Sequence, residues 1–233
     1  MEISRQEETS LQLTGDWSTP EAQRLSEAWF DAIGMYHNLP EWLRYMHGMS
    51  GKKFRYFLNN LVSATPDARY LEVGSWSGST ACSAMYDNAC KITCIENWEH
   101  FGGPRDMFNQ NVQRAINSNV DLKLIEDDFR NVDYANIGKY NIYMYDGPHS
   151  AEDQYDGIMI AQPALDDLYV LIIDDYNQEK DVQAGTAKAF AELNQNIIAQ
   201  ITIKTRWDGQ HPQISHENSD WHNGYLLSLI SKK

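Results

Sequence analysis

Residues 70–80 read Tyr-Leu-Glu-Val-Gly-Ser-Trp-Ser-Gly-Ser-Thr and say most about the fold. An apolar strand here leads into a turn at Gly74 and then into the start of a helix. Because Gly74 lacks a Cβ, its backbone can turn sharply and approach a ligand closely. The helix expected to open between Ser77 and Thr80 directs free N–H groups at that ligand. Glu72 is unsuited to a pyrophosphate but suits a ligand that carries a cation and hydroxyl groups.

The sequence after residue 69 alternates between strand and helix patterns. The expected strands are 69–74, 91–96, 121–126, 140–145 and 169–174. The expected helices are 78–88, 104–117, 151–163 and 179–194, with Ser150 capping the third. This alternation predicts a parallel sheet covered on both faces. Two further strands, 197–205 and 224–230, are close enough in sequence to pair antiparallel.

The N-terminal part of the chain has a different, helical pattern. Residues 1–20 are polar and are interpreted as an irregular arm. Helices are expected over 21–35, from Pro40, and after a capping Ser50. We therefore divide the chain into a helical leader at 1–66, which serves as a lid or as packing, and a main domain at 67–233.

Composition excludes several functional classes. The 233 residues are 42% hydrophobic, which fits one domain with additions. No apolar run approaches the ~18 residues that span a bilayer, and the polar start lacks a signal peptide, so a cytoplasmic protein without a membrane partner is expected. A net charge of −14 disfavours nucleic acid as a partner. The three cysteines lack metal-binding spacing and are expected to be buried, reduced thiols.

Acidic residues follow the other expected strands. A carboxylate at Glu96 can accept hydrogen bonds from both hydroxyls of a ribose, and Asp128 follows the third strand. Two alternatives stay open, because Glu96 also fits a solvated strand end and Asp128 also fits a helix cap. A dinucleotide-binding motif requires glycine at the position of Trp76, which disfavours an NAD site. No lysine follows Gly78, so the Walker motif of nucleoside triphosphate sites is also absent.

A second group of acids ends the fourth and fifth strands. Asp146 and the pair Asp174-Asp175 are 28 residues apart (174 − 146), a gap that one strand-helix-strand unit spans. Three converging carboxylates repel one another unless they are protonated or bind a cation, and oxygen ligands favour a hard ion such as Mg²⁺. His149 is the candidate general base, because imidazole accepts protons near neutral pH. Alternatively, His149 caps a helix and the Asp pair precedes one.

Residues 72–78 resemble the first motif of the class I S-adenosylmethionine (SAM) methyltransferases, acid-x-Gly-x-x-x-Gly. The resemblance implies an α/β, Rossmann-like fold: a mostly parallel seven-stranded sheet with an antiparallel C-terminal strand pair and an N-terminal helical extension. It implies SAM as cofactor, with the acid after the third strand holding the adenine amino group. The implied cofactor-binding residues are Glu72, Gly74, Ser75, Trp76, Gly78, Ser79, Thr80, Glu96, Asn97, Asp128, Phe129 and Asp146.

The sequence Asp146-Gly-Pro-His149, with Asp174-Asp175, further resembles the metal-dependent O-methyltransferases of the catechol and macrocin types. This implies Asp146, Asp174 and Asp175 as ligands of Mg²⁺ or another hard divalent cation, with His149 and Asp146 as catalytic residues. Pro148 replaces an acid found in some relatives.

The expected function is SAM-dependent methyl transfer to a hydroxyl of a small molecule, a sugar or a phenol-like acceptor. The alternatives are a metal-independent methyltransferase and a non-catalytic SAM-binding protein. Aromatic residues of the leader and of the loop 206–222 are candidates for a cover over the acceptor: Trp17, Trp42, Tyr45, His47, Tyr176, Trp207, His211 and Trp221. A homo-oligomer is left open.

Overall fold

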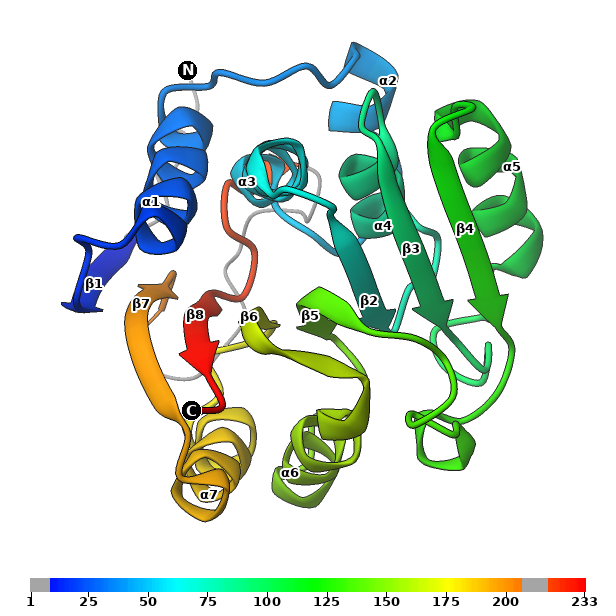
Figure 1. Ribbon diagram of the computed structural model, residues 1–233. Coiled ribbons are helices and arrows are strands. Elements are labelled where there is room, and N and C mark those ends of the chain that lie inside the picture. Colours follow the sequence, from blue (N-terminus) through cyan, green and yellow to red (C-terminus); the bar gives the residue numbers. More distant parts are fainter. Residues whose placement is uncertain (1–8, 207–217) are drawn as a thin grey trace.

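The computed structural model describes residues 9–206 and 218–233. The chain alternates strands and helices along most of its length (Figure 1). The strands are β1 (Ser10–Gly15), β2 (Arg69–Val73), β3 (Cys90–Ile95), β4 (Val120–Ile125), β5 (Tyr140–Tyr145), β6 (Leu165–Ile173), β7 (Asn196–Lys204) and β8 (Tyr225–Ser231). The α-helices are α1 (Pro20–Ile33), α2 (Glu41–Arg44), α3 (Lys52–Ala64), α4 (Ser79–Met85), α5 (Arg105–Ala115), α6 (Ala151–Ile160) and α7 (Ala184–Leu193). The 3₁₀ turns η1 (Phe129–Asn131) and η2 (Gln162–Ala164) and the π-helical turn η3 (Glu179–Gln183) complete the described elements.

All described strands belong to one sheet with the order β1-β7-β8-β6-β5-β2-β3-β4. The five strands from β6 to β4 are parallel, and β8, β7 and β1 add antiparallel pairs at one side. The strand order reverses direction between β5 and β2, the point where open α/β sheets bind ligands. The predicted parallel core and antiparallel C-terminal pair are confirmed.

The sheet has eight strands rather than seven, because part of the expected irregular arm is a strand. β1 pairs antiparallel with β7 over its whole length, from Ser10 opposite Lys204 to Gly15 opposite Ala199. Its side chains are mostly exposed, and the alternation of Leu11 and Leu13 with polar residues is too short to stand out as a strand signal. The strand exists because its backbone groups complete the hydrogen bonds of the β7 edge.

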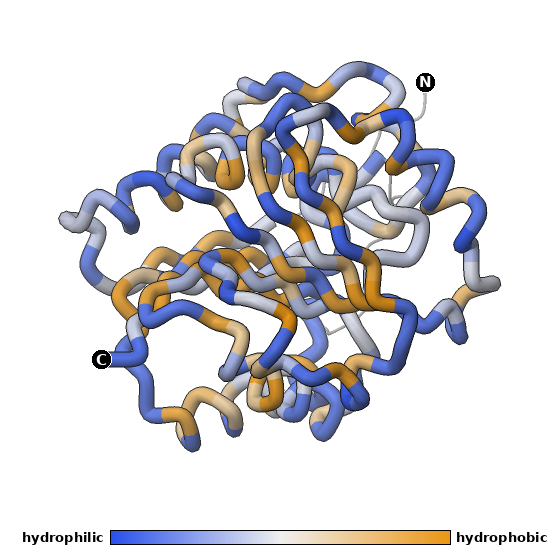
Figure 2. Tube along the Cα trace, turned by 45° about the vertical axis from the view of Figure 1, so that its right-hand side comes forward, coloured by the Kyte–Doolittle hydropathy of each residue, from blue (hydrophilic) through white to orange (hydrophobic). Residues whose placement is uncertain are grey.

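Two hydrophobic cores lie on opposite faces of the sheet. The first joins α1, α3, α4 and α5 to one face, and the second joins α6 and α7 to the other (Figure 1). Figure 2 shows hydrophobic stretches running through the strands in the middle of the molecule, with hydrophilic turns outside. This three-layer arrangement follows from the two faces of each buried parallel strand.

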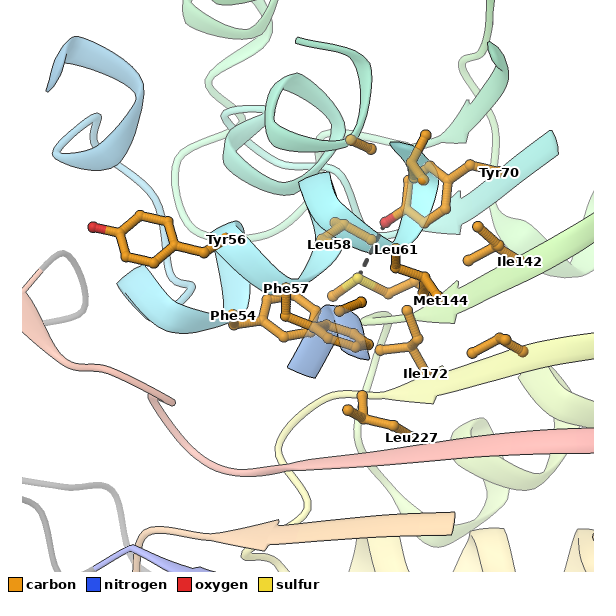
Figure 3. Packing of buried hydrophobic residues seen from close by; sticks show 14 of the residues in the cluster. Phe54, Tyr56, Phe57, Leu58, Leu61, Tyr70, Ile142, Met144, Ile172 and Leu227 are labelled. Atoms are coloured by element: carbon orange, nitrogen blue, oxygen red, sulfur yellow. Dashed lines mark hydrogen bonds between the residues drawn. The ribbon is translucent and has the colours of Figure 1, made fainter. Parts of the chain in front are cut away.

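Helix α3 shows that the helical leader is part of the first core. Phe54, Phe57, Leu58 and Leu61 on α3 lie against side chains of the sheet (Figure 3). The ring of Phe54 stacks on Tyr225 of β8 with centroids 3.7 Å apart. The leader therefore packs on the sheet through α1 and α3, and a lid role is left only to the segment that joins them.

Several predicted boundaries move. Ser50 does not cap α3, since Gly51 is the N-cap residue and the Ser50 hydroxyl instead contacts Ser79. The expected helix 179–194 divides into η3 and α7. Ser150 does cap α6, accepting a hydrogen bond from Asp153 N. Among the described residues no helix is both long and apolar enough to cross a membrane.

Candidate active site

The candidate site lies where the carboxyl ends of the parallel strands meet (the arrowheads of β2, β3 and β4 in Figure 1). The central contact joins β2 to β5: Asp146 N donates to Val73 O over 2.9 Å. Gly74 has φ +87°, and a Cβ there would lie 1.8 Å from the carbonyl oxygen of Asp146. Only glycine therefore fits at this turn. The first motif and the acid of the fourth predicted strand are brought together as expected.

Glu72 is fully buried and its carboxylate has partners within the protein. Tyr70 Oη and Thr80 Oγ1 both donate hydrogen bonds to it. Burial raises the pKa of Glu72 to about 7, and these two hydroxyl donors oppose that rise. The carboxylate thus ties strand β2 to helix α4, and its predicted contact with a cofactor stays a prediction.

The loop from Ser75 to Gly78 is held by neighbouring segments. Ser77 Oγ donates to His47 O at 2.7 Å, and Ser79 and Ser50 hydroxyls share a hydrogen bond of 2.9 Å. Trp76 adopts φ +43°, an uncommon backbone conformation for a bulky residue. Its ring lies 5.0 Å from that of His47. The segment that joins α2 to α3 therefore covers the predicted cofactor loop.

Glu96 ends β3 and faces this loop. Its two carboxylate oxygens accept hydrogen bonds from Trp76 N (2.9 Å) and Trp98 N (2.8 Å). The side chain is half-buried, so each oxygen keeps a lone pair for a further donor. Asn97 accepts a hydrogen bond from Glu99 N, which shapes the loop that follows. The structure thus fixes Glu96 in place beside Trp76, as a ribose-binding role requires.

Asp128 and Phe129 follow β4. Asp128 caps η1 by accepting a hydrogen bond from Arg130 N at 2.8 Å, which confirms the helix-cap alternative for this residue. Phe129 is 4% exposed and packs edge-on against Tyr145. Its ring belongs to the second core, and its predicted role in cofactor binding stays a prediction.

Asp146, Asp174, Asp175 and His149 form the acid cluster, as we call these four residues below. His149 Nε2 lies 3.3 Å from Asp175 Oδ2 and 3.7 Å from Asp146 Oδ1. Asp174 and Asp175 are 2% and 7% exposed, while 24% of the Asp146 side chain remains accessible. The strand ends thus bring Asp146 and Asp175 to the imidazole of His149, while the predicted catalytic and metal-binding roles stay predictions.

The carboxyls of the acid cluster perturb one another. Burial, followed by the charges of Asp174 and Asp175, raises the pKa of Asp146 well above its ordinary value. Burial and the charge of Asp175 do the same to the pKa of Asp174. The exposed part of Asp146 moderates its rise, because water solvates the charged form. At neutral pH the cluster therefore retains a proton or needs a cationic partner.

The donor set of the acid cluster has the chemistry of a hard-cation site, but not the arrangement of one. Asp174 Oδ1 is buried without a hydrogen-bond partner, as is His149 Nδ1. Within residues 9–206 and 218–233, however, no three His, Cys, Asp or Glu side chains form a metal-binding group. As the side chains stand, the geometry does not support the expected Mg²⁺ site.

The structure contradicts two alternative roles, His149 as a helix cap and Asp174-Asp175 as the first turn of a helix. The cap of α6 is Ser150, and His149 turns its Nε2 toward the carboxylates instead. The next helical element after Asp174 and Asp175 begins only at Glu179, so the pair does not form its first turn. Asp175 has φ +55°, a strained conformation that turns the chain away from β6.

Arg55 is a residue of this region that sequence reasoning missed. Its guanidinium is fully buried and donates to the carbonyls of Leu43, Arg44, Met46, Gly48 and Ser50. It thereby fixes the segment that covers the Ser75–Gly78 loop. An arginine between apolar positions of a helix was the only available signal.

The predicted aromatic cover is tested only in part. Tyr45 and His47 are exposed, and His47 lies against Trp76, whereas Trp221 is 3% exposed and belongs to the first core. Trp17, Trp42 and Tyr176 are partly buried against the two cores. Trp207 and His211 lie outside the described residues. No aromatic wall for an acceptor therefore follows from the described part of the chain.

Residues 71–176 match the model of a family described as a methyltransferase domain. Solved structures agree over most of the chain. A structure of TrmN from Thermus thermophilus matches with TM-score 0.55 and 12% identity, covering 82% of this chain and 52% of that one, so the present chain spans about half its length. The fold is that of the class I methyltransferases.

Two further methyltransferase structures have nearly the same extent as this chain. A protein of Pyrococcus horikoshii provisionally assigned as an RNA methyltransferase matches with TM-score 0.55 and 12% identity, covering 88% of this chain and 97% of that one. An O-methyltransferase of Bacillus cereus in complex with S-adenosylhomocysteine matches with TM-score 0.53 and 14% identity, covering 90% and 91%. At such identities the likeness shows the fold alone. No curated protein sequence matches the chain.

The matched methyltransferase domain at residues 71–176 and the solved methyltransferases are the basis for the function proposed below. They leave the acceptor open, because the neighbours act on different classes of molecule.

Proposed function

We propose that this protein transfers a methyl group from SAM to a hydroxyl group of a small-molecule acceptor. The observation that carries the proposal is the imidazole of His149, 3.3 Å from Asp175 and 3.7 Å from Asp146. This base stands at the ends of β5 and β6, beside the Gly74 turn that the matched methyltransferase domain contains. A methyl transfer to oxygen needs such a base next to the donor.

SAM, when bound, supplies the methyl group and a good leaving group, so the protein mainly has to bind and orient. Glu96 offers carboxylate lone pairs on one side of the Gly74 turn, held by Trp76 N and Trp98 N. The acid cluster stands on the other side. The chain thus provides separate places for donor and acceptor, joined at the β2–β5 contact.

His149 is the proposed general base. Its Nε2 lies beside Asp175 and Asp146, and their negative charge stabilises the imidazolium that forms when the acceptor hydroxyl loses its proton. Its Nδ1 is buried without a hydrogen-bond partner, so within the described part of the chain the polar contacts of the ring are those of Nε2 with the two carboxylates. A positioned base of this kind accelerates reactions by about 10²–10⁴-fold.

Assistance by a hard divalent cation such as Mg²⁺ is the finer part of the proposal. It rests on the oxygen donors of Asp146, Asp174 and Asp175 and on the raised pKa values of the first two. A bound cation would lower the pKa of the acceptor hydroxyl. No step above depends on it, because the described residues form no metal-binding group.

A metal-independent methyltransferase is the second candidate, and the position of His149 favours it. The imidazole stands between Asp146 and Asp175, whose carboxylates can balance the imidazolium formed by proton transfer without a metal ion. A non-catalytic SAM-binding protein on the same scaffold is the third, and only a transfer assay separates it from the others.

The test combines a binding and a transfer experiment. Calorimetry should show SAM binding, and a panel of phenolic and glycosidic acceptors should yield S-adenosylhomocysteine, with Mg²⁺ or with EDTA. Loss of turnover in EDTA supports the metal, and undiminished turnover supports the metal-independent reaction. SAM binding without transfer to any acceptor indicates the non-catalytic protein, and absence of SAM binding rejects the proposal.

An acid-cluster variant locates the chemistry. Asp146→Asn should abolish turnover and leave SAM affinity within a few-fold of the wild type, because the amide keeps the size of the side chain but not its charge. Asp31→Asn, an exposed position on α1, is the matched control and should change neither quantity. A folded Asp146→Asn variant with a normal rate would remove this residue from the mechanism.

A further inference from the structure

Tyr225 lies directly beside the acid cluster, although it comes from the opposite end of the sequence. β6 and β8 pair antiparallel with Ile173 opposite Leu226, so the next pair in this register is Asp174 and Tyr225. Tyr225 and Leu227 belong to the first core with Ile172 of β6. Because strand side chains alternate with a period of two, Asp174 follows Ile172 on that same face. The register therefore sets the phenol next to the Asp174 carboxylate.

The ring of Tyr225 is fixed in place. It is fully buried and stacks on Phe54 of α3, with centroids 3.7 Å apart and ring planes 4° from parallel. Such packing restricts the hydroxyl to the groups around it, which are the carboxylates of the acid cluster and the backbone of Gly51. The direction of this hydroxyl is therefore part of the fold, set by α3 and β8 together.

Two polar atoms at this contact lack hydrogen bonds of ordinary geometry. Tyr225 Oη and Asp174 Oδ1 are both buried and unpartnered. The phenol still acts on the carboxyl, since its proximity lowers the pKa of Asp174 against the larger effect of burial. Burial and the charges of Asp174, Asp146 and Asp175 in turn raise the pKa of Tyr225 well above its usual range. The phenol thus stays protonated and can donate.

Buried polar groups without partners are rare in proteins and usually mark a place where a ligand or a small rearrangement completes the hydrogen bonds. Here a donor and an acceptor face one another across a strand pair, at the end of a site built for a ligand. We propose that Tyr225 is a positioning residue. Its hydroxyl donates a hydrogen bond to Asp174 and holds that carboxylate in one orientation within the acid cluster, where the acceptor hydroxyl binds. This inference rests on the proposed function and adds a residue to it.

The first experiment removes only the hydroxyl. Tyr225→Phe keeps the stack on Phe54 and should lower kcat by about 10-fold or more, with SAM affinity within about 2-fold, because misplaced catalytic groups slow the chemical step. Tyr169→Phe is the matched control: this buried tyrosine in the middle of β6 donates to Gln195, which lies just before β7. An unchanged kcat in an active Tyr225→Phe enzyme would overturn the proposal.

The second experiment does not depend on activity. Melting temperatures are measured for Tyr225→Phe, Asp174→Asn and the double variant. If Tyr225 donates to the carboxylate, Tyr225→Phe lowers Tm more in the wild-type background than in the Asp174→Asn background. Additive Tm shifts would overturn the proposal, whatever the enzyme does. A wild-type chain without methyl transfer would instead reject the proposed function, while the Tm cycle would still decide the Tyr225–Asp174 hydrogen bond.

Discussion

Glu72 and Asp146 end neighbouring strands on the same side of the sheet, yet they have different surroundings. Glu72 receives hydrogen bonds from two hydroxyl groups, whereas Asp146 faces two further carboxylates. The first arrangement stabilises the fold around a buried acid. The second leaves charge that only a proton, an imidazolium or a bound cation can balance. At the scale of the residue, the identity of the nearest partner separates a structural acid from a functional one.

Glu72 gives the stability of the protein a pH dependence that can be isolated. Its pKa is 4.5 in the unfolded chain and about 7 in the folded one, so the folded state holds a proton that the unfolded state has lost. The stability from this group is complete below pH 4.5 and is lost as the pH rises through 7, by up to about 3 kcal/mol. Glu72→Gln should therefore flatten the fall of Tm between about pH 5 and 8.

The fall of Tm with pH must be compared with that of the wild type. The raised pKa values of Asp146 and Asp174 make Tm fall with rising pH in the wild type and in Glu72→Gln alike. If Tm falls equally steeply with pH in the wild type and in Glu72→Gln, the pH dependence does not come from Glu72.

His149 and Ser150 separate catalysis from helix capping. His149→Ala should lower kcat by about 10²-fold or more, measured near pH 7.5 with saturating SAM. Ser150→Ala should instead remove the hydrogen bond to Asp153 N and cost about 1 kcal/mol of stability with little change in rate. The reverse pattern, a stability loss in His149→Ala without a rate effect, would give His149 a structural role and remove it from the chemistry.

At the scale of elements, the antiparallel strands β8 and β1 at one side of the sheet have two different structural roles. β8 brings Tyr225 to the acid cluster through its register with β6. β1 covers the edge of β7, which would otherwise present unpaired backbone groups to solvent. Neither role belongs to the parallel core, whose strand ends carry the proposed SAM site, and both depend on pairing between distant parts of the chain.

Gly15 tests how tightly β1 joins the sheet. A Cβ at this residue would lie 2.2 Å from Ile198 O, and the backbone has φ +97°. Gly102 has a similar φ of +82° but open space around it, so Gly102→Ala reports the backbone term alone, about 1 kcal/mol. Gly15→Ala should cost more, by about 1–3 kcal/mol in urea unfolding, because β1 must shift. Equal losses of stability in Gly15→Ala and Gly102→Ala would show that β1 can shift away from β7 at no cost.

The whole molecule is a three-layer sandwich with a strong negative charge. The formal net charge of −14 is spread over 33 acidic and 19 basic residues. Such a charge disfavours a polyanionic acceptor through long-range repulsion. One structural neighbour is provisionally assigned as an RNA methyltransferase, so the fold alone does not exclude RNA. Charge is therefore the property of the whole chain that bears on the acceptor class.

We expect no RNA binding. Filter binding with a radiolabelled tRNA transcript at about 50 mM salt should show no retention up to about 10 μM protein, because non-specific RNA affinity comes mainly from phosphate contacts with basic residues. A basic DNA-binding protein serves as the positive control for the filter. Salt-sensitive retention of the RNA below 10 μM protein would contradict this prediction and point to an RNA acceptor.

Much of the fold could be predicted because its signals are local. Apolar strands, intervening helices, the Gly74 turn and the Ser150 cap each depend on residues close in sequence, and the structure confirms them. The exposed strand β1 is missed, because Leu11 and Leu13 alternate with polar residues only over a short segment whose side chains stay exposed. Ser50 was misassigned for a related reason: its hydroxyl contacts Ser79, far along the chain, rather than the helix start.

By itself, the sequence determined the parallel α/β architecture and the acids at its strand ends, since strand polarity puts those ends on one edge whatever the details. Only the tertiary structure decided what each acid meets there. Glu72 accepts hydrogen bonds from two hydroxyls, Asp128 caps a helical turn, and Asp174 lies beside the phenol of Tyr225. The physical reason is register: which side chains face one another depends on how distant strands pair, and a shift of one residue would turn every one of them to the other face.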